Sequence, residues 1–184
     1  MRVLIADDEA LIRMGLKQMM QELGHMAFTA NNGREALRMV HKHRPDLAIL
    51  DIEMPFSNGI ETAKKIAQIQ PMPVIVVTAY GHDEYIEQAT AVPIHGYLIK
   101  PVSLPEVKAA VSIAVQRFAE KQELERARQE LQDKLETRRL VDRAKGKLMV
   151  QKGLNEEDAY HLLQLRARES RASLKDVALA VLKM

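Results

Sequence analysis

The fold of this chain is decided by residues 47–55, which read Leu47-Ala48-Ile49-Leu50-Asp51-Ile52-Glu53-Met54-Pro55. Four apolar residues lead without interruption to one carboxylate, Asp51, and Pro55 then prevents a regular continuation. Such a run is typical of a central strand in a parallel sheet whose two faces are both covered by helices. Ligands of these sheets bind at the carboxyl ends of the strands. An isolated Asp after a strand can equally cap the following turn, so the other strand ends must decide between the two interpretations.

The length of 184 residues is enough for one core of about 120 residues and a second, smaller unit. The chain has no cysteine, which excludes disulfides and thiolate metal sites. No apolar run approaches the roughly 18 residues that a membrane-spanning helix needs, and the first residues read as a strand rather than a signal peptide. We therefore expect a cytosolic protein with two unequal parts.

Charge divides the chain in the same way. Residues 1–117 carry 12 Lys and Arg against 13 Asp and Glu, residues 118–136 carry 4 against 6, and residues 137–184 carry 11 against 6. A mildly acidic first part and a basic last part indicate that a polyanion is bound near the C-terminal end. A solvated basic surface is the alternative, and charge alone does not decide between them.

Five predicted strands alternate with helical segments in the first part. The strands cover residues 2–7, 26–30, 47–51, 73–78 and 94–100. The intervening segments have helical periodicity and include a short helix at residues 82–91. This alternation predicts an α/β fold, a doubly wound parallel sheet with right-handed crossovers.

Polar side chains stand at the ends of four of these strands. Asp7 and Asp8 follow the first, Asp51 ends the third, Thr78 ends the fourth and Lys100 ends the fifth. Three carboxylates in one place repel one another, and a divalent cation with oxygen ligands, most simply Mg²⁺, relieves the repulsion. A lysine at the same edge can pair with a carboxylate at rest and with an added phosphoryl group afterwards. The arrangement predicts that Asp51 is a nucleophile that accepts a phosphoryl group.

These residues resemble the receiver domain of two-component response regulators, over residues 1–117. The resemblance rests on Asp7-Asp8, Asp51 with Met54-Pro55, Thr78-Ala79, and Tyr97 ahead of Lys100-Pro101. It implies a flavodoxin-like fold with strand order 2-1-3-4-5 and phosphotransfer from a partner histidine kinase. It also implies that Asp8, Asp51 and the main-chain carbonyl of Glu53 are metal ligands, with Asp7 acting through water.

The same resemblance implies two switch residues. Thr78 is expected to move toward the phosphoryl group, and Tyr97 is expected to change rotamer as the read-out. The Lys100-Pro101 peptide bond is expected to be cis. Val92-Pro93 stands where this family often has Gly-Ala, a departure that can reshape the output surface and touches no chemistry.

A long helix is expected to connect the two parts. No Gly or Pro occurs between Pro105 and Gly146, and the apolar face that packs on the sheet ends at Phe118. A short heptad-like seam follows, made of Leu124, Ala127, Leu131 and Leu135. Residues 118–136 are therefore a predicted helical linker, which either dimerises the chain as a coiled coil or remains an isolated, charge-stabilised helix.

Residues 137–184 are predicted to form a small all-α bundle of three helices. The first ends at Gly153, and Asn155 and Ser173 are the predicted N-caps of the second and third. The third helix is mostly apolar and has only two lysines. A recognition helix for the DNA major groove needs base-reading side chains, so this composition disfavours a helix-turn-helix.

This last part resembles the ANTAR domain of RNA-binding transcription antiterminators. The match rests on Ala144-Lys145-Gly146-Lys147-Leu148-Met149, Glu157-Asp158-Ala159-Tyr160, Leu163, Arg166-Ala167-Arg168 and Leu174-Lys175-Asp176-Val177-Ala178. It implies recognition of paired hairpins in a leader transcript, which prevents a terminator from forming. The residues predicted to contact RNA are Arg143, Lys145, Arg166 and Arg171. Tyr160 is predicted to lie in the core among leucines rather than to stack on a base.

The sequence thus predicts a regulator in which phosphorylated Asp51 promotes a homodimer that binds hairpin RNA. A DNA-binding response regulator is the alternative, because basic modules bind both nucleic acids weakly at low salt. An aspartyl-phosphate enzyme such as a phosphatase is disfavoured, because no cap domain is present and Ile52-Glu53 offer no second acidic Asp. We expect slow self-dephosphorylation and no dedicated enzymatic activity.

Overall fold

The computed structural model describes residues 1–55, 58–79 and 94–183. Contacts divide the chain into two compact units, Met1–Gln122 and Glu123–Met184. Each unit has its own hydrophobic core. The predicted helix at residues 82–91 and the departure at Val92-Pro93 lie outside the described residues.

The first unit is built on a sheet of five parallel strands in the order β2-β1-β3-β4-β5. The strands are β1 (Arg2–Ala6), β2 (Met26–Ala30), β3 (Leu47–Asp51), β4 (Val74–Thr78) and β5 (Gly96–Ile99). All five lie where the sequence predicts them, and their order is that of the flavodoxin-like fold. The predicted fold class is therefore confirmed. Because the strands are parallel, all of them end at the same edge of the sheet.

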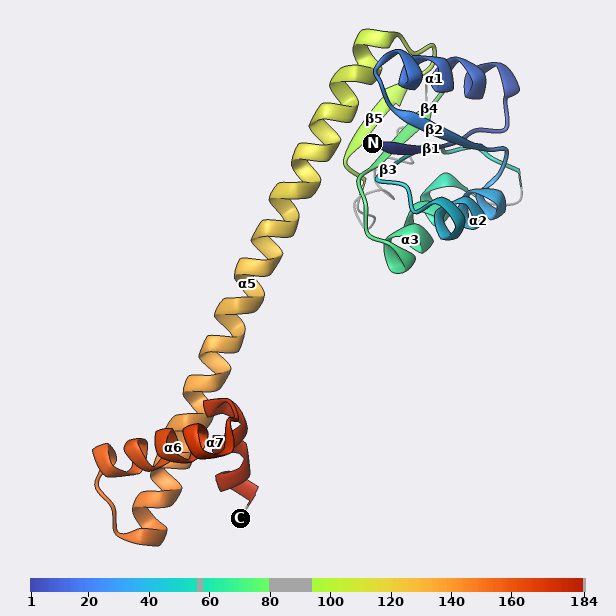
Figure 1. The fold of residues 1–184 in the computed structure, drawn as a ribbon. Helices are drawn as coiled ribbons and strands as arrows, with labels where there is room; N and C mark the ends of the chain where they lie inside the picture. Colours follow the sequence, from blue (N-terminus) through green and yellow to red (C-terminus); the bar gives the residue numbers. More distant parts are fainter. Residues whose placement is uncertain (56–57, 80–93, 184) are drawn as a thin grey trace. The chain divides into compact units, whose positions relative to one another are not determined.

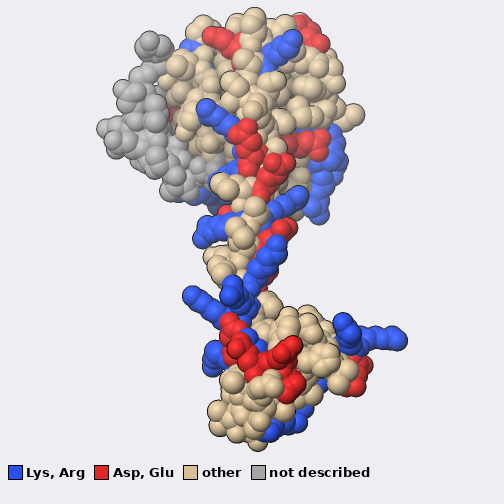
Figure 2. Space-filling model, turned by 90° about the vertical axis from the view of Figure 1, so that its left-hand side faces the viewer, with Lys and Arg blue, Asp and Glu red and all other residues tan. Residues whose placement is uncertain are grey.

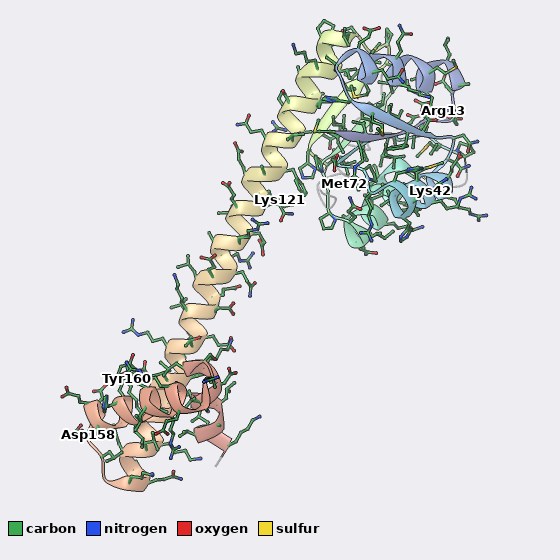
Figure 3. All side chains as sticks on the ribbon, viewed as in Figure 1. Arg13, Lys42, Met72, Lys121, Asp158 and Tyr160 are labelled. Carbon is green, nitrogen blue, oxygen red and sulfur yellow. The ribbon has the colours of Figure 1, made fainter. Side chains whose placement is uncertain are left out.

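Helices cover both faces of this sheet (Figure 1). The first part of α5 (Leu104–Lys152) and α1 (Ala10–Glu22) pack on one face, and α2 (Gly33–His43) and α3 (Gly59–Ile69) pack on the other. Every residue of β3 is buried, as its apolar run predicts. Met72, just before β4, also lies in the core on the α2 and α3 side (Figure 3). Each fully buried large aliphatic side chain contributes about 1.5–3 kcal/mol to this packing.

The second unit is a bundle of the last part of α5 with α6 (Glu156–Ser170) and α7 (Leu174–Lys183). Its core is formed by Val141, Ala144, Leu148, Ala159, Leu163, Val177, Ala178 and Val181. The prediction of three helices is confirmed, and the first of them is continuous with the linker, because α5 runs unbroken through residues 118–136. No helix in the described ranges is long and apolar enough to cross a membrane.

Polar side chains begin the helices of both units. Asn32, Asn58, Asn155 and Ser173 cap α2, α3, α6 and α7 by accepting a hydrogen bond from a main-chain N–H. The predicted caps of α6 and α7 are therefore confirmed. Two helices end without the usual glycine: Arg44 after α2 and Arg171 after α6 have left-handed φ angles of 48° and 52°. That conformation costs a residue other than glycine roughly 1 kcal/mol.

Candidate functional site

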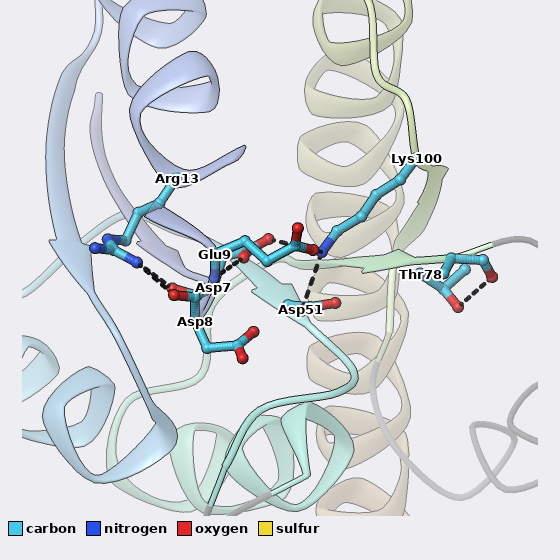
Figure 4. Close-up of polar contacts among 8 residues, drawn as sticks. Asp7, Asp8, Glu9, Arg13, Asp51, Thr78 and Lys100 are labelled. Atoms are coloured by element: carbon cyan, nitrogen blue, oxygen red, sulfur yellow. Dashed lines mark hydrogen bonds and ion pairs between the residues drawn. The ribbon is translucent and has the colours of Figure 1, made fainter. Parts of the chain in front are cut away.

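Side chains from four strand ends lie at the carboxyl edge of the sheet (Figure 4). Asp7 follows β1, Asp51 ends β3, Thr78 ends β4 and Lys100 follows β5. The register of the sheet sets the ends of β3, β4 and β5 side by side. Residues up to 93 positions apart in the sequence thus reach one small region of the surface.

The ammonium group of Lys100 is the centre of this region. Its Nζ donates a hydrogen bond to Asp51 Oδ2 at 3.1 Å and to Glu9 Oε1 at 2.9 Å. A third carboxylate, Asp7, places Oδ2 at 3.1 Å from the same nitrogen, as an ion pair without hydrogen-bond geometry. One cation therefore serves three carboxylates.

Burial and mutual repulsion shift the ionisation of these groups. Burial, and after it the charge of Asp7, raises the pKa of Asp51 to about 6, although Lys100 acts in the opposite direction. Burial also raises the pKa of Asp7. Burial disfavours the charged form of Lys100, but its hydrogen bonds to the carboxylates outweigh this and raise the pKa of the ammonium group. The carboxylates carry more negative charge than one lysine neutralises, so the site gains from a further cation.

Three carboxylates of the site can hold a metal ion. Asp7, Asp8 and Asp51 each offer one oxygen, and these oxygens lie within 4.8 Å of one another. Asp7 Oδ2 is buried and has no hydrogen-bond partner among the described residues, so it is available to a ligand. The adjoining pocket, of about 290 Å³, is lined by Asp8, Glu9, Asp51, Glu53, Ala79 and Lys100. Oxygen donors without His or Cys favour Mg²⁺, which keeps several waters, and the residues present fit that ion.

Glu9 and Arg13 belong to the site although the sequence did not single them out. Asp7 Oδ1 accepts a hydrogen bond from the main-chain N–H of Glu9 at 2.8 Å. Arg13 donates from Nη1 to the main-chain carbonyls of Asp7, at 2.7 Å, and Asp8, at 3.2 Å (Figure 4). These bonds fix the loop between β1 and α1. The only sequence signal was that Glu9 continues the acidic pair and Arg13 follows it by about one helical turn.

Gly59 lets α3 begin directly against the end of β3. A Cβ atom at this position would overlap the main-chain oxygen of Asp51. The Gly59 N–H donates a hydrogen bond to the carbonyl of Ile52 at 2.9 Å, which holds the helix start in place. Any side chain here would displace the backbone that carries Asp51.

The two expected switch residues do not touch Asp51. The Thr78 hydroxyl donates a hydrogen bond to the carbonyl of Ala79 at 3.1 Å and stands apart from Asp51 in Figure 4. Tyr97, on β5, is exposed. The Lys100-Pro101 peptide bond is cis, as expected.

The residues predicted to contact RNA lie in the second unit and differ in their surroundings. Arg143, on α5, and Arg171, after α6, are exposed, and Arg166, on α6, is half-buried. Within the described part of the chain, none of the three arginines forms an ion pair. Figure 2 shows basic and acidic side chains interspersed on the visible face of this unit.

Lys145, unlike these arginines, forms ion pairs. Its Nζ lies 2.8 Å from Asp142 Oδ1 and 2.8 Å from Glu156 Oε1, and its side chain is only 16% exposed. The same nitrogen lies 6.0 Å from the centroid of the Tyr160 ring. Tyr160 is 40% exposed, so the prediction that it lies in the core is wrong. Tyr160, on α6 (Figure 3), lines a groove together with Leu174, Arg138 and Lys145.

A flavodoxin-like sheet with Asp51 and Lys100 at its carboxyl edge is the architecture of the response regulators. Comparison with protein families agrees with the structure. The response regulator receiver domain matches residues 3–112, and the ANTAR domain matches residues 129–182. The chain therefore belongs to the response regulators and combines a receiver domain with an ANTAR domain.

Individual relatives give the same result. The transcriptional regulatory protein PdtaR of Mycobacterium tuberculosis is 42% identical over 183 residues, which cover 99% of this chain and 89% of PdtaR. The sporulation initiation phosphotransferase F of Bacillus subtilis is 36% identical over 60% of this chain and 90% of its own length.

Solved structures match the first unit. The chemotaxis protein CheY4 of Vibrio cholerae superimposes with a TM-score of 0.59 and 31% identity, over 61% of this chain and 97% of CheY4. A response regulator receiver domain protein from Clostridium thermocellum gives a TM-score of 0.59 and 29% identity, over 63% of this chain and 94% of that protein.

Proposed function

We propose that this protein is a phosphorylation-switched regulator of transcription that binds hairpin RNA. A sensor histidine kinase phosphorylates Asp51, two copies of the chain associate, and their ANTAR domains bind paired hairpins in a leader transcript so that a terminator does not form. The observation that carries the first step is the contact of Asp51 with Lys100 inside a cluster of carboxylates. The name of PdtaR, a transcriptional regulatory protein, supports transcription as the regulated process.

In the phosphotransfer step a carboxylate oxygen of Asp51 attacks the phosphorus of the donor. A new O–P bond forms, the bond from phosphorus to the donor's leaving group breaks, and that group departs with the electron pair. The Lys100 ammonium, already 3.1 Å from Asp51 Oδ2, donates a hydrogen bond to an oxygen of the transferred group. Thr78 then turns to the phosphoryl group and Tyr97 changes rotamer. Water slowly hydrolyses the acyl phosphate, and we assign no other turnover to the protein.

A bound Mg²⁺ would neutralise the phosphoryl oxygens during this step. Asp8, Asp51 and the main-chain carbonyl of Glu53 would hold it, with Asp7 acting through water. The buried Oδ2 of Asp7 supports this assignment, because it has no hydrogen bond among the described residues beyond its ion pair with Lys100, and an acceptor buried in this way gains from a further partner.

The proposed RNA surface combines free cations with an exposed ring. The guanidinium groups of Arg143, Arg166 and Arg171 can donate to phosphates or base edges. Tyr160 borders a groove of about 530 Å³, whose cationic lining residues are Lys134, Arg138 and Lys145. An exposed aromatic ring beside cations suits a splayed base of a hairpin loop. Lys145 must release Asp142 and Glu156 before it can reach a phosphate.

Duplex DNA is the weaker candidate ligand. A recognition helix must present base-reading side chains to the major groove. Few side chains of α7 are polar. One of them, Lys175, is already paired with Glu136 and Asp133 of α5.

The proposed dimer uses the seam on α5. Leu124, Leu131 and Leu135 are 72%, 61% and 61% exposed. Three large apolar side chains on an exposed helix face are stabilised when a second copy covers them. Two linked modules that meet two hairpins make the second contact intramolecular, which can raise avidity by roughly 10²-fold.

The test of the whole proposal measures binding by phosphorylated full-length protein to three probes at matched salt. These are an RNA with two hairpins, taken from transcripts that co-purify with the protein, the same RNA with one hairpin deleted, and a DNA duplex of equal length. We expect the two-hairpin RNA to bind at least tenfold more tightly than either of the others. Equal affinity for the first two probes would exclude the dimer mechanism, and preference for the duplex would favour the DNA-binding alternative.

A further inference from the structure

Lys100 has one partner that the phosphotransfer described above does not use. Its Nζ lies closer to Glu9 Oε1, at 2.9 Å, than to Asp51 Oδ2, at 3.1 Å. The main chain of Glu9 is fixed, because its N–H donates to Asp7 Oδ1 at 2.8 Å. The Glu9 side chain can therefore move away from Lys100 while its main chain stays in place.

The three carboxylates around Lys100 are not equally able to leave it. The side chains of Asp7 and Asp51 are 0% and 5% exposed, whereas that of Glu9 is 61% exposed. A buried carboxylate that loses its cation is left without solvation, whereas an exposed one is taken up by water at little cost. Glu9 is therefore the partner that can be displaced.

An incoming phosphoryl group makes such a displacement necessary. An ammonium group has three N–H donors. Lys100 Nζ hydrogen-bonds Glu9 and Asp51, and the Asp7 carboxylate lies 3.1 Å from the same nitrogen, so three carboxylate oxygens already surround it. To donate to a phosphoryl oxygen, Lys100 must give up one of these partners.

We propose that Glu9 is a positioning residue that holds Lys100 at rest and releases it when a phosphodonor enters the site. This inference rests on the proposed role of Asp51 as the phosphoacceptor. Glu9 thereby sets how fast different donors react. Its carboxylate borders the same pocket as Asp8, Asp51 and Glu53, with Lys100 as the cation of that pocket, so it also adds negative charge at the entrance.

The charge of the donor makes this role measurable. Acetyl phosphate reaches the site as a dianion; its P–O bond to acetate breaks, and acetate leaves with the electron pair as the bond to Asp51 forms. Phosphoramidate reaches it as a monoanion; its P–N bond breaks, and ammonia leaves with the electron pair. Repulsion by Glu9 scales with the charge of the donor, so Glu9 slows acetyl phosphate more.

The experiment compares Glu9→Gln with the wild-type full chain, with Mg²⁺ present and both donors at low and high salt. We expect phosphorylation of Asp51 by acetyl phosphate to accelerate about fivefold, that by phosphoramidate to accelerate less, and the difference to shrink at high salt. The matched control is Glu22→Gln. Glu22 is the last residue of α1, the helix that follows Glu9, and its only hydrogen-bond partner among the described residues is Gln18. Its replacement by Gln removes the same charge as Glu9→Gln does. This control should leave both rates unchanged.

A second measurement does not depend on phosphorylation. In unmodified protein labelled with ¹⁵N-lysine, the Nζ resonance of Lys100 should shift in Glu9→Gln and stay in place in Glu22→Gln. An unchanged Lys100 resonance in Glu9→Gln would overturn the inference, as would equal rates for the two variants with both donors. If wild-type Asp51 takes up no phosphoryl group from either donor, the proposed function fails, which is a different result.

Discussion

The two units of this protein place their functional groups in opposite settings. In the first, Asp7 and Asp51 are buried at the end of a sheet, and Lys100 reaches them from another strand. In the second, Arg143 and Arg171 are exposed on a helical bundle and form no ion pair with any described residue. A parallel sheet fixes the distances between the few side chains at its strand ends. A helix surface instead presents several cations in similar, exposed surroundings.

These settings determine how each proposed activity responds to a single substitution. Chemistry that depends on one buried nucleophile is all or none. Binding that depends on several exposed cations decreases in steps, because each cation contributes a small and nearly independent share of the binding free energy.

The largest expected effect is loss of phosphorylation in Asp51→Asn. The amide is no nucleophile, so the side chain that ends β3 beside Lys100 can no longer accept the phosphoryl group. Intact-protein mass spectrometry after incubation with acetyl phosphate and Mg²⁺ should show one added phosphoryl group in the wild type and none in the variant. Asp46→Asn, which changes an exposed acid, is the control and should be labelled normally. Labelling of Asp51→Asn would refute a single buried nucleophile, and labelling that survives chelation of Mg²⁺ would refute the metal requirement.

Substitution of one glycine in each unit should change the unfolding free energy in opposite directions. Gly59→Ala forces a methyl group onto the main chain of Asp51, which should cost about 2–3 kcal/mol of unfolding free energy. Gly146→Ala adds a methyl group to an α5 position that has nothing within 4 Å, which should stabilise the second unit by about 0.5–1 kcal/mol. Urea unfolding followed by circular dichroism measures both. The same sign for the two variants would contradict this account.

The strands and the meeting of the site residues could be predicted because both follow from simple patterns. Apolar runs such as 47–50 are readable as buried strands, and parallel strands must end at one edge. Asp7, Asp51, Thr78 and Lys100 each stand at the end of a predicted strand, so the sequence already indicates that they lie close together. The long helix after Pro105 could also be predicted, since no Gly or Pro interrupts it before Gly146, whereas its continuation through Gly146 into the bundle is a finding of the structure.

Contacts between side chains on separate elements could not be predicted in this way. Glu9 and Lys100 are 91 residues apart, and Lys145 and Glu156 are 11 apart and on different helices. Tyr160 occupies a boundary position of α6, where burial depends on what the neighbouring helix covers. Periodicity specifies the face of a helix but not the partner that reaches it.

A smaller expected effect is the pH dependence of stability, which tests the repulsion between carboxylates in the first unit. The pKa of Asp51 rises from 3.8 to about 6 on folding, mainly through burial. Ionisation of this group therefore opposes folding: the penalty is absent below pH 3.8, grows up to about pH 6 and is complete above it. Asp51→Asn removes the penalty but also weakens the bond to Lys100, so we expect a gain of roughly 1–2 kcal/mol at pH 7.5.

Thermal unfolding of the wild type and Asp51→Asn at pH 4 and pH 7.5 measures this gain. The variant should be the more stable protein at pH 7.5 and should lose that advantage at pH 4. Added Mg²⁺ should raise the unfolding temperature of the wild type more than that of the variant. An advantage that is independent of pH would show that charge repulsion at Asp51 is not its cause.

The smallest expected effects are in RNA binding. Arg143→Ala and Arg166→Ala should each weaken binding about threefold, the double variant about tenfold, and none of them should change phosphorylation. Lys145→Ala should reduce the stability of the second unit more than its affinity, because Lys145 ties α5 to the first turn of α6. Fluorescence anisotropy with labelled RNA gives these values. Complete loss from one arginine would show that this surface, too, depends on a single residue.

The burial of β3 has a consequence for how the first unit exchanges hydrogen with solvent. The strand pairs with β1 on one side and β4 on the other, and all five of its residues are buried. Its amides therefore exchange for deuterium only when the whole unit unfolds, whereas the amide of the exposed residue Asp8, in the loop between β1 and α1, exchanges in local openings. The proposed nucleophile Asp51 thus lies on the slowest-exchanging segment of the unit and Asp8 on a fast-exchanging one, so deuterium uptake reports the two parts of the site separately.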